Sequence, residues 1–255
     1  MEVRKYENRA QLGRDAGREV AAAIRDLLSS GNEPEVNMVF AAAPSQQEFL
    51  EALVEEKDID WSRVNAFHMD EYIGLSPDAP QRFGNFLAER LFGKVPFRTV
   101  HYLNGSAPDL QAECDRYGAL LRSFPTDIVC MGIGENNHIA FNDPHVADFR
   151  DPQWVKVVTL DAACRRQQVN DGCFEKLDYV PTQALTLTVP ALMAGDAIYC
   201  MVPGSNKAQA VRNTLLEDVD EQFPSTILRT HPKAMLFVDR DSARLLPNGG
   251  SNLPK

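Results

Sequence analysis

One short segment, residues 131–144, gathers side chains that could move protons. It reads MGIGENNHIAFNDP and follows an apolar run at 126–130 that predicts a buried strand. His138 lies at its centre, with Asn136 two residues before it and Asp143 five residues after it. A histidine oriented by one polar partner can relay a proton for a bound molecule near neutral pH. The plainer alternative is a core histidine satisfied by hydrogen bonds, and the lack of a third glycine argues against a dinucleotide site.

A second candidate is the acidic pair Asp70 and Glu71, which directly follows an apolar strand predicted at 64–69. A carboxylate held half-buried at the end of a strand can have its pKa tuned for proton abstraction. The alternative is an acidic pair that caps a nearby helix. The sequence alone favours neither explanation.

Two further turns each join a strand to a helix and could bind an anion. In the segment 202–213, Lys207 falls in the first turn of a helix, where its charge is unfavourable unless an anion lies nearby. In the segment 40–49, small residues precede Ser45, which we also expect to begin a capping box for the next helix. This turn lacks the Gly-Lys-[Ser/Thr] ending of a Walker A loop. A solvated surface lysine and a purely capping serine are the simpler explanations.

The elements that must position these residues alternate along the chain between apolar runs and helical patterns. Strands are predicted at 36–42, 64–69, 99–104, 126–133, 154–160, 183–189, 197–202 and 234–239. Helices are predicted at 9–30, after Ser45, and at 109–124 and 205–218. This order predicts an α/β fold: a single doubly wound, modified Rossmann-like domain with a mostly parallel central sheet of about seven strands flanked by helices.

We expect the domain to span 1–246 and the segment 247–255 to be a flexible tail. Ligands of doubly wound sheets bind beyond the carboxyl ends of the strands. All four polar clusters follow predicted strands, so we expect them at that edge of the sheet.

The composition narrows the class of partner. Of the 255 residues, 44% are hydrophobic and 24% charged, as is usual for a globular protein. No apolar run approaches the roughly 18–20 residues that span a membrane, and no secretion signal is visible, so we expect a cytoplasmic protein without a membrane partner. A net charge of −10 and the lack of a basic block argue against nucleic acid. The five cysteines show no metal-ligand spacing, so neither a metal nor a disulfide is expected.

Several segments together resemble glucosamine-6-phosphate deaminases, in that family's order and approximate spacing. They are FHMDEYIGL (67–75), LNGSAPD (103–109), MGIGENNHIAFNDP (131–144), VPTQALTLTVPALMAGDAIYCMVPGSNKAQAV (180–211) and THPKAMLFVD (230–239). The resemblance implies a cofactor-free conversion of glucosamine 6-phosphate to fructose 6-phosphate and ammonia. It implies a phosphorylated amino sugar as the small-molecule partner, and it is compatible with a homo-oligomer, because family members often form oligomers.

The resemblance also implies a role for each catalytic candidate. Asp70 matches the base that takes the C2 proton of the sugar and passes it to C1. His138 matches the histidine that opens the pyranose ring at the ring oxygen, and Asn136 and Asp143 match the residues that orient it. Asp143 is shorter than the family's glutamate at that position, so the loop must restore its reach to His138.

On the phosphate side, Lys207 matches the family's phosphate-binding lysine, and Ser45 lies in the corresponding phosphate turn. The family's phosphate arginine has no secure counterpart; Arg165 or Arg166 could serve, and Arg166 is preferred. The residue before the histidine, a glycine in the family, is Asn137 here. These departures indicate a divergent branch.

Two other functions remain open. The first is that of a 6-phosphogluconolactonase-like hydrolase. Such enzymes share the fold, but their sequences resemble Gly-His-Thr-Ala-Ser-Leu-Phe-Pro at the histidine motif and Asp-Glu-Arg at the acidic motif. The present text, HIAFNDP at 138–144 and DEY at 70–72, favours the deaminase. The second is a non-catalytic sugar-phosphate sensor. Retention of both Asp70 and His138 argues against it, because binding alone does not require a base.

Overall fold

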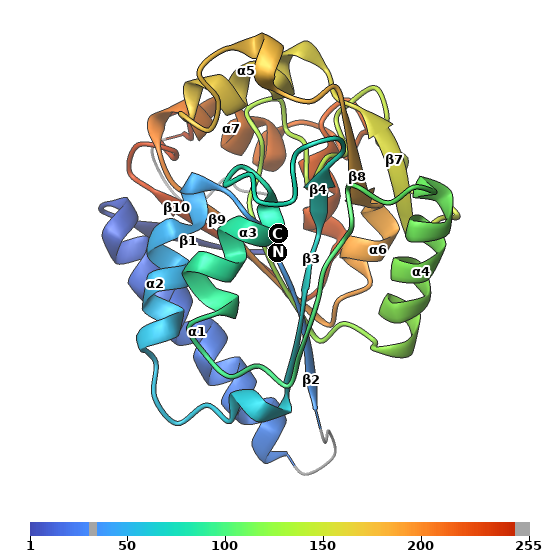
Figure 1. The fold of residues 1–255 in the computed structure, drawn as a ribbon. Coiled ribbons are helices and arrows are strands. Elements are labelled where there is room, and N and C mark those ends of the chain that lie inside the picture. Colours follow the sequence, from blue (N-terminus) through green and yellow to red (C-terminus); the bar gives the residue numbers. More distant parts are fainter. Residues whose placement is uncertain (31–34, 248–255) are drawn as a thin grey trace.

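The computed structural model describes residues 1–30 and 35–247, and its centre is a seven-stranded sheet (Figure 1). The strand order is β1-β10-β9-β6-β2-β3-β5, and every pairing in it is parallel. The strands are β1 (Glu2–Tyr6), β2 (Val36–Phe40), β3 (Val64–His68), β5 (Thr99–His101), β6 (Ile128–Met131), β9 (Ala197–Val202) and β10 (Ala234–Asp239). The predicted α/β class with a mostly parallel sheet of about seven strands is confirmed.

The membership of that sheet was predicted incorrectly. The runs expected at 154–160 and 183–189 do form strands, β7 (Val155–Thr159) and β8 (Gln183–Leu187), but these pair antiparallel in a separate sheet of order β4-β8-β7. An apolar run does not reveal which sheet its strand joins. Strand β1 takes a place at the edge of the central sheet, and we missed it because its sequence, EVRKY, is mostly polar.

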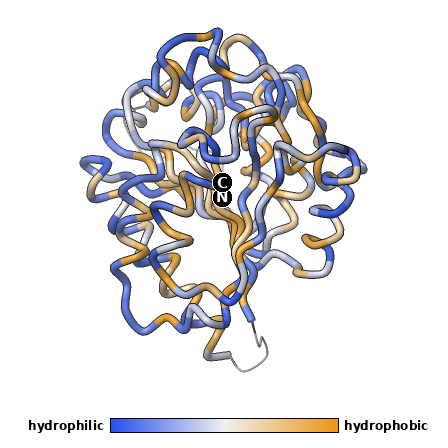
Figure 2. The backbone as a smooth tube through the Cα atoms, viewed as in Figure 1, coloured by the Kyte–Doolittle hydropathy of each residue, from blue (hydrophilic) through white to orange (hydrophobic). Residues whose placement is uncertain are grey.

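Helices cover both faces of the central sheet, and each face has its own apolar core. Met38 and Phe40 of β2 belong to one core and Val39 to the other, as the alternation of side chains along a strand requires. Figure 2 shows the hydrophobic residues concentrated on the strands in the middle of the molecule. The α-helices are α1 (Arg9–Ser29), α2 (Gln47–Glu55), α3 (Phe83–Leu87), α4 (Leu110–Ser123), α5 (Ala162–Asn170), α6 (Val189–Met193) and α7 (Ala208–Leu216).

Short helical turns complete the structure. A π-helical turn, η3 (Ala88–Phe92), extends α3, and the 3₁₀ turns are η1 (Pro44–Gln46), η2 (Trp61–Arg63), η4 (Leu177–Tyr179), η5 (Ser205–Lys207) and η6 (Pro224–Thr230). The capping box expected at Ser45 does not form. The chain enters α2 through η1, and the residue before α2, Gln46, makes no capping hydrogen bond with its side chain. The Ser45 hydroxyl is therefore not used to begin the helix.

The order of the strands reverses beside β2. The chain runs outward from β2 to β3 and β5 and then returns to place β6 on the other side of β2. The loops that follow β2 and β6 consequently diverge and leave a crevice at the carboxyl ends of the strands. No helix among the described residues is long and apolar enough to cross a membrane. The expected tail at 247–255 lies, apart from residue 247, outside the described residues.

Candidate active site

A cavity at the carboxyl edge of the central sheet brings together the four polar clusters of the sequence. Its lining includes the turn after β2, the first residues after β3, the loop after β6 and the turn after β9. The residues that carry chemical interest there are Ser45, Gln46, Asp70, His138, Gln168 and Lys207. A carboxylate and an imidazole predicted from separate motifs therefore face one common hollow.

The backbone of Asp70 is fixed in the cavity lining by its neighbours in the fold. It begins β4 (Asp70–Tyr72), where it pairs with Thr186 of β8, and its carbonyl accepts a hydrogen bond from the His68 ring at 2.9 Å. Only 7% of the residue is exposed, and its Oδ1 has no hydrogen-bond partner within the described chain. Burial, and then the charge of Glu71, raises the pKa of Asp70 well above its ordinary value. A desolvated, unpaired carboxylate of this kind is a strong proton acceptor once ionised.

Glu71 has the other role that the sequence allowed for this acidic pair. Its carboxylate accepts hydrogen bonds from the amides of Tyr72 at 2.9 Å and of Phe83 and Gly84 at 3.0 Å. Arg82 Nε lies 3.8 Å from its Oε2. Glu71 therefore caps the N-terminus of α3, while Asp70 is left to face the cavity.

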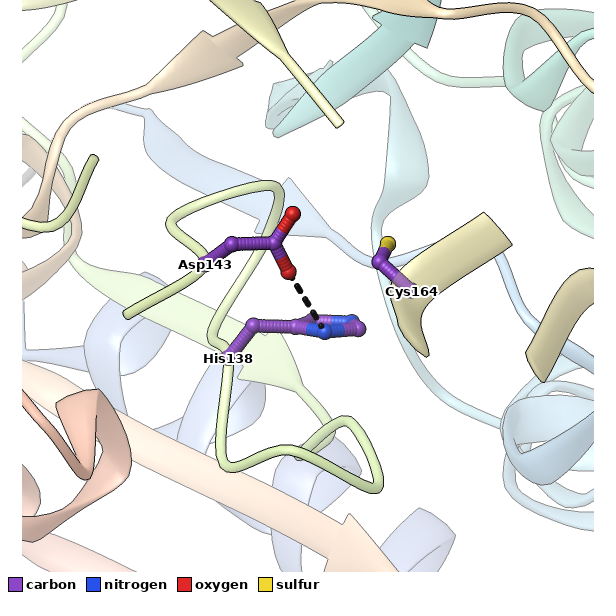
Figure 3. Close-up of side chains that lie close together, drawn as sticks. All are labelled: His138, Asp143 and Cys164. Carbon is purple, nitrogen blue, oxygen red and sulfur yellow. Dashed lines mark ion pairs between the residues drawn. The ribbon is translucent and has the colours of Figure 1, made fainter. Parts of the chain in front are cut away.

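His138 is oriented by both residues that the sequence assigned to it. Its Nδ1 lies 2.6 Å from Asn136 Oδ1 and 3.2 Å from Asp143 Oδ1, the contact drawn in Figure 3. Because an ionised carboxylate can only accept, we assign the proton to Nδ1, which leaves Nε2 free to exchange a proton with a bound molecule. The shorter side chain of Asp143 thus still reaches the histidine.

Asn136 is fixed in turn by two carboxylates. Its Nδ2 donates to Asp143 Oδ1 at 3.0 Å and to Asp161 Oδ2 at 3.1 Å, which directs its oxygen to His138. Burial alone would raise the pKa of Asp143, but hydrogen bonds from His138, Asn136 and the Asp161 amide outweigh it, so the net pKa is lowered. Asp143 therefore remains a carboxylate beside the histidine.

Cys164 of α5 lies beside this pair, as Figure 3 shows. The ligand atoms of His138, Asp143 and Cys164 all lie within 4.8 Å of one another, a set that could hold a soft divalent cation such as zinc. However, both Asp143 oxygens already accept hydrogen bonds, from Asn136 and from the Asp161 amide. Burial also raises the pKa of the Cys164 thiol well above its ordinary value. The arrangement favours a hydrogen-bonded acid–base group.

Lys207 supplies positive charge to the lining of the cavity. It is 4% exposed and is the only cationic side chain among the described residues that line the cavity, besides the titratable His138. Burial lowers its pKa, and the more distant charges of Asp171 and Glu135 partly oppose this shift. Within the described chain no carboxylate lies within ion-pair distance of its ammonium group. A buried ammonium without a counter-ion favours an anionic ligand.

The structure does not bring the predicted phosphate arginine to the cavity. Arg166 is exposed on α5 and is absent from the described lining, and the Arg165 guanidinium donates to the carbonyls of Leu177 and Val180 at 2.8 and 2.9 Å. Gln168, two residues after Arg166, lines the cavity instead. We missed Gln168 because an uncharged side chain gives no electrostatic signal in a sequence.

The fold and the site together define a doubly wound α/β protein with an acid–base pair and a buried cation at one edge of its sheet. Comparison with known proteins narrows this class. A model of the family described as glucosamine-6-phosphate isomerases/6-phosphogluconolactonase matches residues 7–237. The chain belongs to this family, and the resemblance noted in its sequence is confirmed.

Individual relatives cover nearly the whole chain. A glucosamine-6-phosphate deaminase of Listeria innocua is 35% identical over 223 residues, which cover 88% of this chain and 92% of the relative. The corresponding protein of Streptococcus sanguinis is 31% identical over 246 residues, 96% of this chain and 99% of the relative. Among solved structures, a monomeric glucosamine-6-phosphate deaminase superposes with a TM-score of 0.86 at 29% identity, over 96% of this chain and 100% of that one. A 6-phosphogluconolactonase from Thermotoga maritima shares the fold. It superposes with a TM-score of 0.75 at 21% identity, over 94% of this chain and 99% of that one.

Proposed function

We propose that this protein is a glucosamine-6-phosphate deaminase, a hydrolase that converts glucosamine 6-phosphate and water to fructose 6-phosphate and ammonia. The observation that carries the proposal is that Asp70, with its unpaired buried oxygen, lines the same cavity as His138 and Lys207. The deaminases among its relatives, at 31% and 35% identity, support the same substrate. A cytoplasmic location stays a prediction.

Each group has a step in this reaction. Lys207 and Ser45, with Gln168 in the place expected for Arg166, would bind the phosphate of the sugar. His138, held by Asn136 and Asp143, would take the proton of the C1 hydroxyl on Nε2 and give it to the ring oxygen as the ring opens. Asp70 would then remove the C2 proton and return it to C1, while a proton of the amino group passes to O1. The C1 carbonyl thereby becomes a hydroxyl, and the double bond moves to C2 as an imine. Hydrolysis of that imine releases ammonia.

The test is a coupled assay of ammonia release from glucosamine 6-phosphate by the purified protein and by an Asp70→Asn variant. General acid–base help is worth about 10²–10⁴-fold, so turnover should fall by that factor while the substrate still binds. Asp148→Asn, a change of the same kind at an exposed loop position, serves as the matched control.

Two other outcomes would replace the proposal. Opening of 6-phosphogluconolactone without release of ammonia from the amino sugar would assign the hydrolase activity of the family's other branch. Binding of glucosamine 6-phosphate by the unmodified protein, with no product from either substrate, would make it a sensor. Mass spectrometry of the reaction mixtures distinguishes all three.

A further inference from the structure

Asn137, immediately before His138, has an unusual backbone conformation and a completely buried side chain. Its φ is 68°, in the left-handed region that asparagine tolerates better than most residues other than glycine. Only 1% of the residue is exposed. An asparagine therefore occupies a position where glycine would be easier, and its side chain must be satisfied in the interior.

That side chain is fully hydrogen-bonded to two other elements. Its Nδ2 donates to the Ala210 carbonyl and to Ser225 Oγ, both at 2.8 Å, and its Oδ1 accepts from Asn213 Nδ2 at 3.0 Å. The Ser225 amide also donates to the Asn137 carbonyl at 2.9 Å. A buried polar network with every member satisfied holds its elements in one arrangement.

Asn137 joins the elements that carry Lys207 and His138. Ala210 and Asn213 lie in α7, which continues directly from η5 with Lys207 as its last residue. On the other side, the amide of Asn137 donates to the Gly134 carbonyl at 3.0 Å, within the tight turn that ends at His138. The network therefore links the imidazole loop to the helix that begins beside the buried ammonium.

We infer that Asn137 is a positioning residue, which sets the location of His138 relative to Lys207 by tying the 134–138 turn to α7 and η6. The inference rests on the proposed function, in which the histidine acts on the sugar ring while the lysine holds the phosphate. A sugar phosphate has a fixed span between those two points. The protein must hold its two groups at the matching separation, and a displacement of about 1 Å can cost about 10² in rate.

The variant Asn137→Gly tests this, because glycine adopts the same φ without strain and removes only the network. We expect kcat for ammonia release to fall about 10- to 100-fold and KM to change by less than about threefold, because Lys207 keeps its own place at the end of η5. In a His138→Gln background the same substitution should have almost no further effect, because it acts through the histidine.

A matched control is Thr226→Ala in η6. Thr226 is fully buried, and its Oγ1 donates to the Phe223 carbonyl at 2.6 Å, but its side chain is not one of the hydrogen-bond partners of Asn137. This variant should lose stability without a change in kcat. Equal losses of kcat from Asn137→Gly in the wild-type and His138→Gln backgrounds would show a merely structural role and overturn the inference.

A readout that does not need turnover separates this inference from the proposed function. Hydrogen exchange should be faster in Asn137→Gly at the Gly134 and Ser225 amides, which the 134–138 turn and its link to η6 protect in the wild type. If the wild type releases no ammonia, the proposed function fails. Unchanged exchange at these amides would refute the positioning role in either case. If Asn137→Gly does not fold, Asn213→Ala, which removes one donor to the network, should give the same pattern with a smaller loss.

Discussion

Gly134 offers a test of the histidine geometry, because the His138 ring packs directly on it. A Cβ built at Gly134 would overlap three atoms of that ring, Cε1, Nδ1 and Nε2. The backbone there is not in the left-handed region, so alanine is compatible with the local conformation. The variant Gly134→Ala therefore perturbs the ring and leaves the chain path unstrained.

The size of the effect follows from van der Waals contact. Carbon and nitrogen atoms pack at about 3.5–4.0 Å, so the ring must retreat by about 1 Å or more. Such a movement breaks the 2.6 Å contact of Nδ1 with Asn136 and the 3.2 Å contact with Asp143. We expect kcat to fall by about 10², and by up to about 10⁴ if the whole contribution of the histidine is lost.

The assay is steady-state ammonia release combined with calorimetric binding of glucosamine 6-phosphate. Binding should stay within about threefold of wild type, because Lys207 does not depend on the ring. Gly118→Ala in α4 is the matched control. Its Cβ would meet the Trp154 side chain at 3.3 Å, neither residue belongs to the described cavity lining, and activity should be unchanged. A folded Gly134→Ala protein with wild-type kcat would refute the assigned role of His138 in this orientation.

Three further predictions concern Asp70 and the residues expected to bind the phosphate. Asp70 must be ionised to accept a proton, and its pKa is raised. As the pH is lowered, kcat/KM should therefore begin to fall at a pH higher than the range in which an ordinary aspartate titrates, as a pH–rate profile would show. A carboxyl whose pKa is raised on folding stabilises the folded state at low pH, and this stabilisation is lost as the pH rises. The melting temperature of Asp70→Asn should therefore exceed that of the wild type by an amount that grows from about pH 4 upward. A difference in melting temperature that does not depend on pH would contradict this. Gln168→Ala should raise KM about tenfold or more by removing a hydrogen bond to the phosphate, whereas Arg166→Ala should leave KM unchanged; the reverse result would restore the arginine assignment.

The sequence was sufficient for the parts of the site that follow from sheet topology. Parallel strands share one carboxyl edge, so polar residues that directly follow apolar runs had to meet there, and Asp70, His138 and Lys207 do so. The predicted partners Asn136 and Asp143 also contact the histidine, because both lie in the same short loop. Short-range patterns and one topological rule were enough for these residues.

Contacts between distant segments could not be predicted in the same way. Asn137 bonds to residues 73 and 88 positions further along the chain, and nothing in the local text of either segment specifies that pairing. The same holds for β7 and β8, whose apolar pattern suits either sheet, and for Glu71, whose three amide donors include two from the start of α3. In each case the outcome depends on how the elements pack.

The buried carboxylates of Glu71 and Asp143 receive hydrogen bonds and Asp70 Oδ1 does not, which indicates that Asp70 is unpaired for a chemical reason. Glu71 receives three amide hydrogen bonds, and Asp143 receives bonds from an asparagine, a histidine and an amide. The fold can therefore satisfy a buried acid in this region. Among the described residues, Asp70 is the one carboxylate left with a buried oxygen that has no partner. Such an oxygen costs folding free energy, and donors placed on it would lower its basicity, so leaving it bare keeps a strong base available for the proton of a bound substrate.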